Sequence, residues 1–342
     1  MPGRLHRRRF VRGAGAALGG AALGLGWSRP GLVAAAAADS KTQLKTQPKT
    51  QPRTQPKTQP KAKIRAIESG ARGVTLTLGL EHGPFPAPGA PYRDDTCLVF
   101  VPHHFRASPD ARVDTLVHFH GHHATVREVV ESMQIREQLA DSRQNAILVA
   151  PQGPVDAADS RGGKLETEGG LEAMLGEVRR ALQRPEAAEA LGAAALPAGA
   201  RIGAVALSAH SGGYRVAGAC LHHGGFEVTE VYLFDALYGS RDRYLSWVLE
   251  RRAETSARAR HKLVCAYRKG RVATQSEALM GELDHEGVGY LRAKGEAAVV
   301  DRQAVRARAV FIATDVRHNH VMHEAGLLRR CLEWSCFRRR SA

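Results

Sequence analysis

Short apolar runs alternate along this chain with longer segments whose apolar residues recur at the spacing of an α-helix. The short runs predict β-strands, and the longer segments predict α-helices. The predicted strands are residues 74–78, 96–102, 115–120, 146–151, 201–207, 228–234, 263–267 and 309–313, and the predicted helices are residues 126–139, 170–182, 213–222, 243–251, 275–283 and 325–336. Strands that are apolar along their whole length are typical of a sheet buried on both faces. We therefore expect an α/β fold, with a mostly parallel central sheet and helices on both faces.

Residues suited to catalysis follow the carboxyl ends of four predicted strands, where ligands bind in sheets of this kind. The stretch HFHGHH, residues 118–123, begins in the third strand and continues beyond it. Ser211 follows the fifth strand, Asp235 the sixth and His318 the eighth. Because the ends of parallel strands meet at one edge of a sheet, we expect these segments to form one site.

Ser211 lies in the stretch LSAHSGGYR, residues 207–215, where an apolar run gives way to a helical pattern. A serine hydroxyl is a weak nucleophile, so an imidazole must accept its proton and a carboxylate must orient that imidazole. We predict that Ser211 is the nucleophile, His318 the base and Asp235 the carboxylate. His320 is the alternative base, and Asp315 is the alternative carboxylate.

The glycines beside Ser211 leave room for a sharp turn of the backbone into the next helix. The backbone nitrogen of Gly212 would lie at the start of that helix, where it can donate a hydrogen bond to an oxyanion. The second donor is expected from the backbone of Gly121 and His122, in the loop after the third strand.

These residues resemble the α/β-hydrolase superfamily, in which serine, acid and histidine follow one another in this chain order. With CLVFVP at 97–102 and PQGP at 151–154, the chain is similar to secreted esterases of the feruloyl-esterase and polyhydroxyalkanoate-depolymerase type. The resemblance covers residues 96–325 and implies a single α/β-hydrolase-like domain. It also implies a serine hydrolase that forms an acyl-enzyme and cleaves a carboxylic ester or an amide, without a cofactor. Two departures are Ala209, where the family has a glycine, and the acid, which the family usually places after the seventh strand.

Two other functions are compatible with the same residues. HFHGHH has the histidine spacing of the metallo-β-lactamase motif, with His122 in place of an aspartate, and imidazole-rich sites suit zinc. His210, Asp235 and His318 or His320 follow in an order that this family also uses for ligands. This would give a metal-dependent hydrolase. Alternatively, the chain is a catalytically inactive hydrolase scaffold that binds cell-envelope polymers through a basic segment.

The amino-terminal part of the chain predicts export rather than folding. Residues 1–40 are interpreted as a signal peptide, because Arg7-Arg8-Arg9-Phe10-Val11 fits the twin-arginine pattern and an uncharged Gly/Ala stretch follows. Residues 41–63 repeat KTQP and predict a disordered linker. The hydrolase domain would then be residues 64–342, in a periplasmic or secreted bacterial protein without a transmembrane domain in its mature form.

The net charge of +15 comes mainly from the tails. Residues 1–65 hold fourteen Lys and Arg and one acidic residue, which leaves about +2 for residues 66–342. A nucleic-acid partner is therefore not expected. The expected partners are a small-molecule or polymeric ester and the twin-arginine export machinery. Of the five cysteines, Cys97, Cys220 and Cys265 lie in apolar runs and are predicted to be buried thiols.

Overall fold

The computed structural model describes residues 62–340. The predicted signal peptide (1–40) and residues 41–61 of the predicted linker lie outside the described residues. Lys63, the last residue assigned to that linker, already belongs to the first strand.

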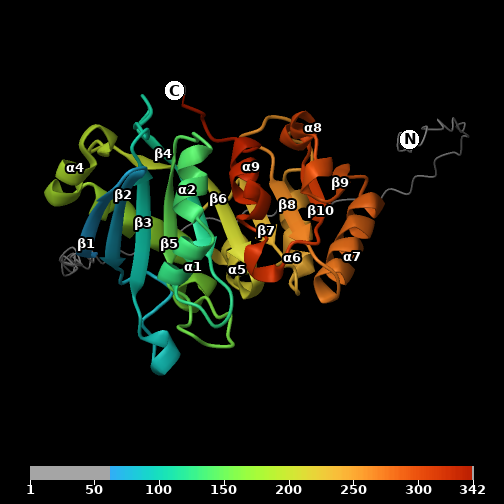
Figure 1. The fold of residues 1–342 in the computed structure, drawn as a ribbon, viewed down its shortest axis with the longest axis horizontal. Coiled ribbons are helices and arrows are strands. Elements are labelled where there is room, and N and C mark those ends of the chain that lie inside the picture. Colours follow the sequence, from blue (N-terminus) through green and yellow to red (C-terminus); the bar gives the residue numbers. More distant parts are fainter. Residues whose placement is uncertain (1–61, 341–342) are drawn as a thin grey trace, which may run out of the picture. The chain divides into compact units, whose positions relative to one another are not determined.

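Within residues 62–340, ten strands form one mixed sheet in the order β1-β2-β3-β5-β4-β6-β7-β8-β10-β9 (Figure 1). The pairs β1–β2, β2–β3 and β3–β5 are antiparallel, and all other neighbours are parallel. The strands are β1 (Lys63–Gly70), β2 (Gly73–Gly79), β3 (Thr96–Pro102), β4 (Arg112–Phe119), β5 (Ala146–Pro151), β6 (Arg201–His210), β7 (Glu230–Phe234), β8 (Lys262–Tyr267), β9 (Tyr290–Lys294) and β10 (Ala309–Ala313).

The eight predicted strands are all present, and the structure adds β1 and β9 at the two edges of the sheet. Both edge strands are largely exposed or half-buried, so neither carries the continuous apolar run on which the predictions rested. An edge strand has a neighbour on one side alone and needs fewer apolar residues.

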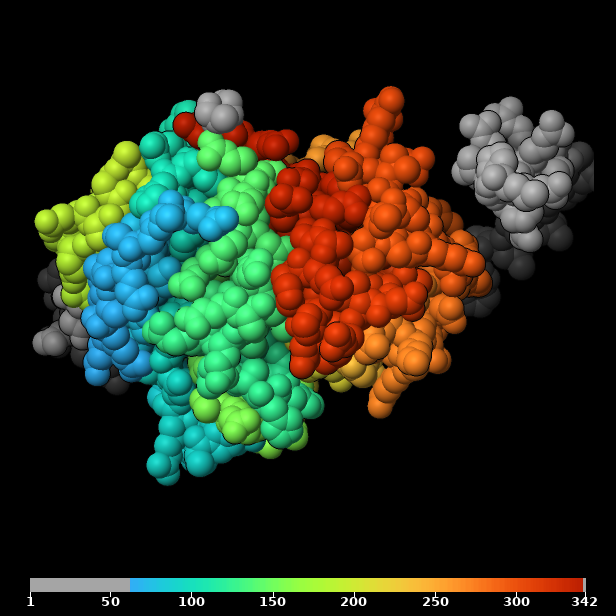
Figure 2. Space-filling view, in the orientation of Figure 1, coloured from blue at the N-terminus to red at the C-terminus, as the bar shows by residue number. Residues whose placement is uncertain are grey.

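Helices cover both faces of the sheet, and the fold class predicted from the sequence is confirmed. One face packs against α3 (Gly170–Leu182), α4 (Pro185–Leu191), α5 (Tyr214–His223), α6 (Arg241–Glu250) and α7 (Arg271–His285). The other packs against α1 (Val126–Ser132), α2 (Ile135–Asp141), α8 (Asp301–Arg306) and α9 (Leu327–Glu333). Figure 2 shows α1, α2 and α9, in green and red, covering the middle of this second face.

The helix predicted over residues 126–139 is in fact two helices, α1 and α2. Gln134 between them has a left-handed backbone, with φ 52°, which breaks the helical hydrogen-bond pattern. The apolar residues continue on both sides of the break, since Val129, Val130, Ile135 and Leu139 all pack into the same cluster. Periodicity alone therefore did not reveal the interruption.

Alternate residues of the central strands point to opposite faces. Val205 and Leu207 of β6 pack with α3–α7, whereas Ala204 and Ala206 pack with the helices of the second face. Burying a leucine or valine in this way contributes about 2 kcal/mol to folding. Within the described residues, no helix has the length and apolar character needed to cross a bilayer.

Candidate active site

Ser211 occupies a strained turn between β6 and α5. β6 ends at His210, a short 3-10 turn covers Ser211–Gly213, and α5 begins at Tyr214. Ser211 has φ 51°, a left-handed conformation that costs energy for a residue with a side chain. An added Cβ at Gly213 would collide with the carbonyl oxygen of Phe119, so glycine is required there. The turn presents the serine at the carboxyl edge of the sheet.

The loop after β4 lies directly against this serine. A Cβ added to Gly121 would come 2.7 Å from Ser211 Cβ and 3.2 Å from its Oγ. The ring of His122 lies against Gly212, where an added Cβ would come 2.7 Å from the imidazole, and His122 Nε2 is 2.6 Å from Ser160 Oγ. The three residues predicted to bind the oxyanion, Gly121, His122 and Gly212, are thus adjacent to Ser211.

Asp235 and His318 form a hydrogen-bonded pair beside the serine. Asp235 directly follows β7 with φ 45°, and its Oδ1 accepts a hydrogen bond from the backbone nitrogen of Arg268 at 3.0 Å. Its Oδ2 lies 2.6 Å from His318 Nδ1, and the carboxylate side chain is 4% exposed against 31% for the imidazole. A carboxylate can only accept, so Nδ1 carries the proton and Nε2 has a free lone pair.

A cavity of about 610 Å³ brings Ser211 and His318 together. Its wall is formed by the loop at Gly121 and His122, by Val129 of α1, by Met133 directly after α1, and by the loop after β10. Across the described part of the chain, the Ser211 hydroxyl has no hydrogen-bond partner. Catalytic hydrogen bonds often tighten only when substrate binds, so this geometry is compatible with a serine–imidazole pair.

The alternative base and the alternative acid have other surroundings. His320 Nδ1 lies 3.8 Å from Glu324 Oε2, and the His320 ring packs near His323. Asp315 is exposed. The structure therefore joins Asp235 to His318, across 83 residues of sequence, in preference to the other pairings.

The histidines of HFHGHH do not converge as metal ligands would. His118 Nδ1 lies 3.0 Å from Ser208 Oγ beneath the site, and His120 Nε2 accepts from the backbone nitrogen of Gly153 at 2.8 Å. His122 contacts Ser160, and His123 faces outward with Asp156 3.7 Å from its Nδ1. Among residues 62–340, no three His, Cys, Asp or Glu side chains form a group suited to a metal ion. The histidines of this motif are thus dispersed. The later candidate ligands His210, Asp235 and His318 do lie together, but His318 Nδ1 is hydrogen-bonded to Asp235 and His210 Nε2 to a main-chain carbonyl oxygen.

Three of the site's imidazoles are buried and neutral. Burial lowers the pKa of His118 and His120, and it lowers the pKa of His210 to about 4. The nearby charge of His318 is the second cause of this low pKa of His210. From the sequence, His210 was a candidate only as a ligand of the metal-dependent alternative. Its signal was a histidine at the end of an otherwise apolar strand, directly before the predicted nucleophile.

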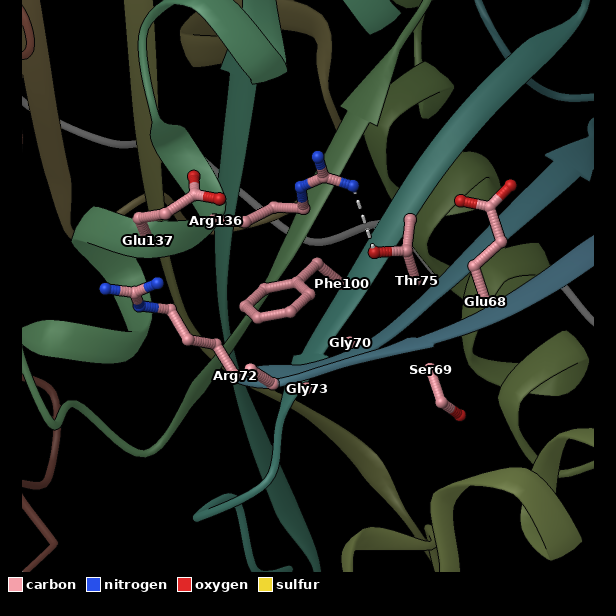
Figure 3. A pocket seen from close by; sticks show the side chains of 10 residues that line it. Glu68, Ser69, Gly70, Arg72, Gly73, Thr75, Phe100, Arg136 and Glu137 are labelled. Carbon is pink, nitrogen blue, oxygen red and sulfur yellow. Dashed lines mark hydrogen bonds between the residues drawn. The ribbon is translucent and has the colours of Figure 1, made fainter.

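A second pocket, of about 350 Å³, lies between the β1–β2 hairpin and α2 (Figure 3). Phe100 forms part of its wall, Arg136 donates to Thr75 at 3.4 Å, and Arg72 pairs with Asp141. Its lining among the described residues includes Ser69 but no histidine, and no lining residue has a positive φ. It therefore lacks the imidazole base and the strained serine of the cavity at Ser211.

All five cysteines are buried free thiols in the structure, as predicted for Cys97, Cys220 and Cys265. Burial raises the pKa of Cys265 to about 12 and that of Cys336 to about 12, so neither is a reactive thiolate.

No family model matches the chain, and no curated protein matches it either. Solved structures with a similar fold include a ferulic acid esterase, with 14% identity and a TM-score of 0.47 over 80% of this chain and 97% of that chain. An S-formylglutathione hydrolase from Staphylococcus aureus has 12% identity and a TM-score of 0.45, over 77% and 95% of the two chains. A siderophore hydrolase from Aspergillus nidulans has 14% identity and a TM-score of 0.41, over 79% and 97%. The sheet order of this chain, and its serine on a strained turn between strand and helix, are those of the α/β-hydrolase fold that the sequence resemblance implied.

Proposed function

We propose that this chain is an exported serine hydrolase that cleaves carboxylic esters through Ser211, His318 and Asp235. The observation that carries the proposal is the 2.6 Å contact between Asp235 Oδ2 and His318 Nδ1, on the same cavity as a serine held at φ 51°. Each of the three groups comes from a different strand end. Their meeting at one edge of the sheet is what a nucleophile, a base and an orienting carboxylate require.

In the first half of the reaction, Ser211 Oγ bonds to the acyl carbon while His318 Nε2 takes the hydroxyl proton. Asp235 accepts the hydrogen bond from Nδ1 and stabilises the imidazolium that forms. The tetrahedral intermediate collapses when Nε2 returns the proton to the leaving alkoxide, which departs as the alcohol. An acyl group then remains on Ser211.

In the second half, a water molecule attacks the acyl carbon and gives its proton to His318 Nε2. Collapse of this second intermediate breaks the bond to Ser211 Oγ, which recovers the proton, and releases the carboxylic acid. In both intermediates the negative oxygen would accept hydrogen bonds from backbone nitrogens at Gly212 and at Gly121 or His122. One such donor contributes about 3 kcal/mol to transition-state stabilisation.

The lining of the cavity indicates where the leaving alcohol of the ester lies. The leaving alcohol must be within reach of His318, and therefore lies in the 610 Å³ cavity. Its lining includes histidines, Asn319 and Ser132 together with the apolar Ala124, Val129 and Met133. A partly polar alcohol fits this lining. An amide would need the same residues and is the second candidate.

The proposal is tested by covalent labelling of the full-length protein with a fluorophosphonate, followed by mass spectrometry of the labelled peptide. The expected result is one label at Ser211, absent in Ser211→Ala. The matched control is Ser208→Ala, which removes a buried hydroxyl three residues earlier in β6 and should still be labelled.

Two outcomes would contradict the proposal. One is a folded protein that neither takes the label at Ser211 nor hydrolyses p-nitrophenyl acetate, which would favour an inactive binding scaffold. The other is stoichiometric bound zinc together with activity that survives Ser211→Ala and is lost to a chelator. That result would restore the metal-dependent alternative.

Export is the second part of the proposal, and it rests on the twin-arginine pattern at Arg7 and Arg8. Fractionation of bacteria that express the full chain should find the processed protein outside the cytoplasm. Replacing both arginines by lysine should leave it in the cytoplasm, and equal export of both forms would overturn this part.

A further inference from the structure

His210 links the nucleophile to the loop that carries the base. It is the last residue of β6, immediately before Ser211, and its side chain is buried. Its Nε2 lies 2.9 Å from the main-chain carbonyl oxygen of His318. Its ring packs on the His318 ring, with centroids 4.5 Å apart and planes at 39°.

The direction of this hydrogen bond follows from its acceptor, and burial of His210 fixes the charge of the ring. A carbonyl oxygen can only accept, so the proton is on Nε2 of His210. Burial and the neighbouring charge of His318 hold the pKa of His210 at about 4, which keeps the ring neutral near pH 7. A neutral ring can lie against His318 without repelling the imidazolium that forms there during the reaction.

His318 needs this support because it lies outside the regular elements. It begins a single 3-10 turn, His318–His320, in the loop after β10. Asp235 fixes the ring through Nδ1, but it does not contact the backbone of residue 318 in any hydrogen bond of the described residues. The bond from His210 fixes the backbone, and it does so from the residue next to the nucleophile.

We propose that His210 is a positioning residue that sets the distance between His318 Nε2 and Ser211 Oγ by holding the His318 backbone and ring. This inference rests on the proposed function of Ser211 and His318. His210 does not exchange a proton with substrate. Its effect is on the geometry of the base, and a misplacement of about 1 Å can cost about 100-fold in rate.

The test separates the donor from the ring. His210→Phe keeps an aromatic ring against His318 and removes the donor, whereas His210→Gln can place an amide N–H where Nε2 was. We expect His210→Phe to lower kcat about 100-fold with KM within about threefold of wild type, because substrate binding does not use the donor. His210→Gln should retain kcat within about tenfold of wild type. Fluorophosphonate labelling of Ser211 should slow in the same proportions.

The matched control is His261→Phe. His261 is another buried imidazole that bonds a main-chain carbonyl oxygen, that of Trp247, and its ring stacks on Trp247, but it lies directly before the amino end of β8. His261→Phe should leave kcat within about threefold of wild type. Thermal unfolding midpoints of all variants show whether each is folded, and His210→Leu repeats the test if the phenylalanine does not fit.

Three results would overturn the inference, each measured on folded variants. They are an unchanged kcat in His210→Phe and His210→Leu, an equal loss of kcat in His210→Gln and His210→Phe, and an equal loss of kcat in His261→Phe and His210→Phe. In each of these cases the wild-type protein is still labelled at Ser211. Failure of the proposed function is distinct, because wild-type protein itself would then take no label.

Discussion

The two ends of strand β7 each carry a buried carboxylate, and the two carboxylates have different surroundings. Glu230 begins the strand, and Asp235 follows its last residue. At the amino end, Glu230 accepts hydrogen bonds from the backbone nitrogen of Cys336, at 2.7 Å, and from the hydroxyl of Tyr232. Lys262 lies nearby and is 0% exposed. Its ammonium donates to the carbonyl oxygens of Ala304 and Trp334, at 2.9 and 2.7 Å.

At the carboxyl end, Asp235 is buried too, but its partner reaches the surface of a cavity. His318 is 31% exposed and lines the 610 Å³ space beside Ser211. The backbones of Ser211 and Asp235 both have positive φ. At the amino end, no backbone strain is found at Glu230, Tyr232 or Lys262.

The comparison shows how buried titratable groups that only stabilise the fold differ from those that can act on a substrate. Both ends contain perturbed titratable groups. At the amino end burial lowers the pKa of Lys262 to about 8 and raises that of Glu230, and at the carboxyl end burial lowers the pKa of His210 to about 4. A perturbed pKa alone does not distinguish them. The closed, fully bonded cluster can act on stability alone, whereas the pair that opens onto a cavity can act on a substrate. The two ends should therefore respond differently to substitution.

The largest effect is expected at Ser211. Ser211→Ala should lower kcat/KM for p-nitrophenyl acetate by about 10⁴-fold or more, because no other group can form the acyl-enzyme. The unfolding free energy should remain within about 1 kcal/mol of wild type, since the hydroxyl has no partner to lose. Steady-state kinetics and urea unfolding measure the two quantities. If Ser211→Ala kept an activity within tenfold of wild type, the carboxyl end of the sheet would no longer differ from the amino end in its contribution to catalysis.

Asp235→Asn should have the next largest effect, a fall of about 10³-fold in kcat. The amide can no longer hold Nδ1–H in the tautomer that leaves Nε2 free as a base. Asp315→Asn is the matched control and should leave kcat unchanged, because Asp315 is exposed and His318 Nδ1 is hydrogen-bonded to Asp235 instead. If kcat fell in Asp315→Asn and stayed unchanged in Asp235→Asn, Asp315 would be the orienting carboxylate.

Lys262→Met should affect stability and not catalysis. It leaves two carbonyl oxygens without their donor and Glu230 without its neighbouring positive charge, which should cost about 3 kcal/mol of unfolding free energy. The kcat of the folded fraction should stay within about twofold of wild type. Lys294→Met, on the exposed part of β9, is the control and should change neither. A large loss of kcat in Lys262→Met at native stability would show that the amino end takes part in function.

The smallest effect is on the pH dependence of stability. The pKa of His210 is about 4 in the folded protein and about 6.5 when unfolded, so below pH 6.5 the unfolded chain takes up a proton that the folded chain does not. The contribution of the neutral ring is complete above pH 6.5 and is lost as the pH falls toward 4. Wild type should lose about 2 kcal/mol more than His210→Gln between pH 7 and pH 5, as measured by urea unfolding at each pH. Parallel losses in the two proteins would show that His210 is not held neutral by burial.

Most of the fold was predictable from the sequence, because fully apolar strands and one-sided helices leave a periodic pattern that does not depend on distant residues. Eight strands, the order of the catalytic residue types and the turn at Ser211 all followed from such local patterns. The edge strands β1 and β9 and the break at Gln134 did not, since an exposed strand or a single left-handed residue leaves no periodic signal.

The choice of partners within the site was decided by the tertiary structure. In the sequence His318 and Asp235 were preferred for their place at strand ends, but His320 and Asp315 remained alternatives, because residue type and position along the chain do not show which side chains touch. The packing of β7, β8 and β10 side by side brings Asp235 to His318 and turns His320 toward Glu324. The same packing separates the histidines of HFHGHH and buries His210 against the His318 backbone. The sequence by itself determined which chemical groups reach this edge of the sheet. Which of them touch depended on long-range contacts, since hydrogen bonds at 2.6–2.9 Å require positions that only the assembled sheet defines.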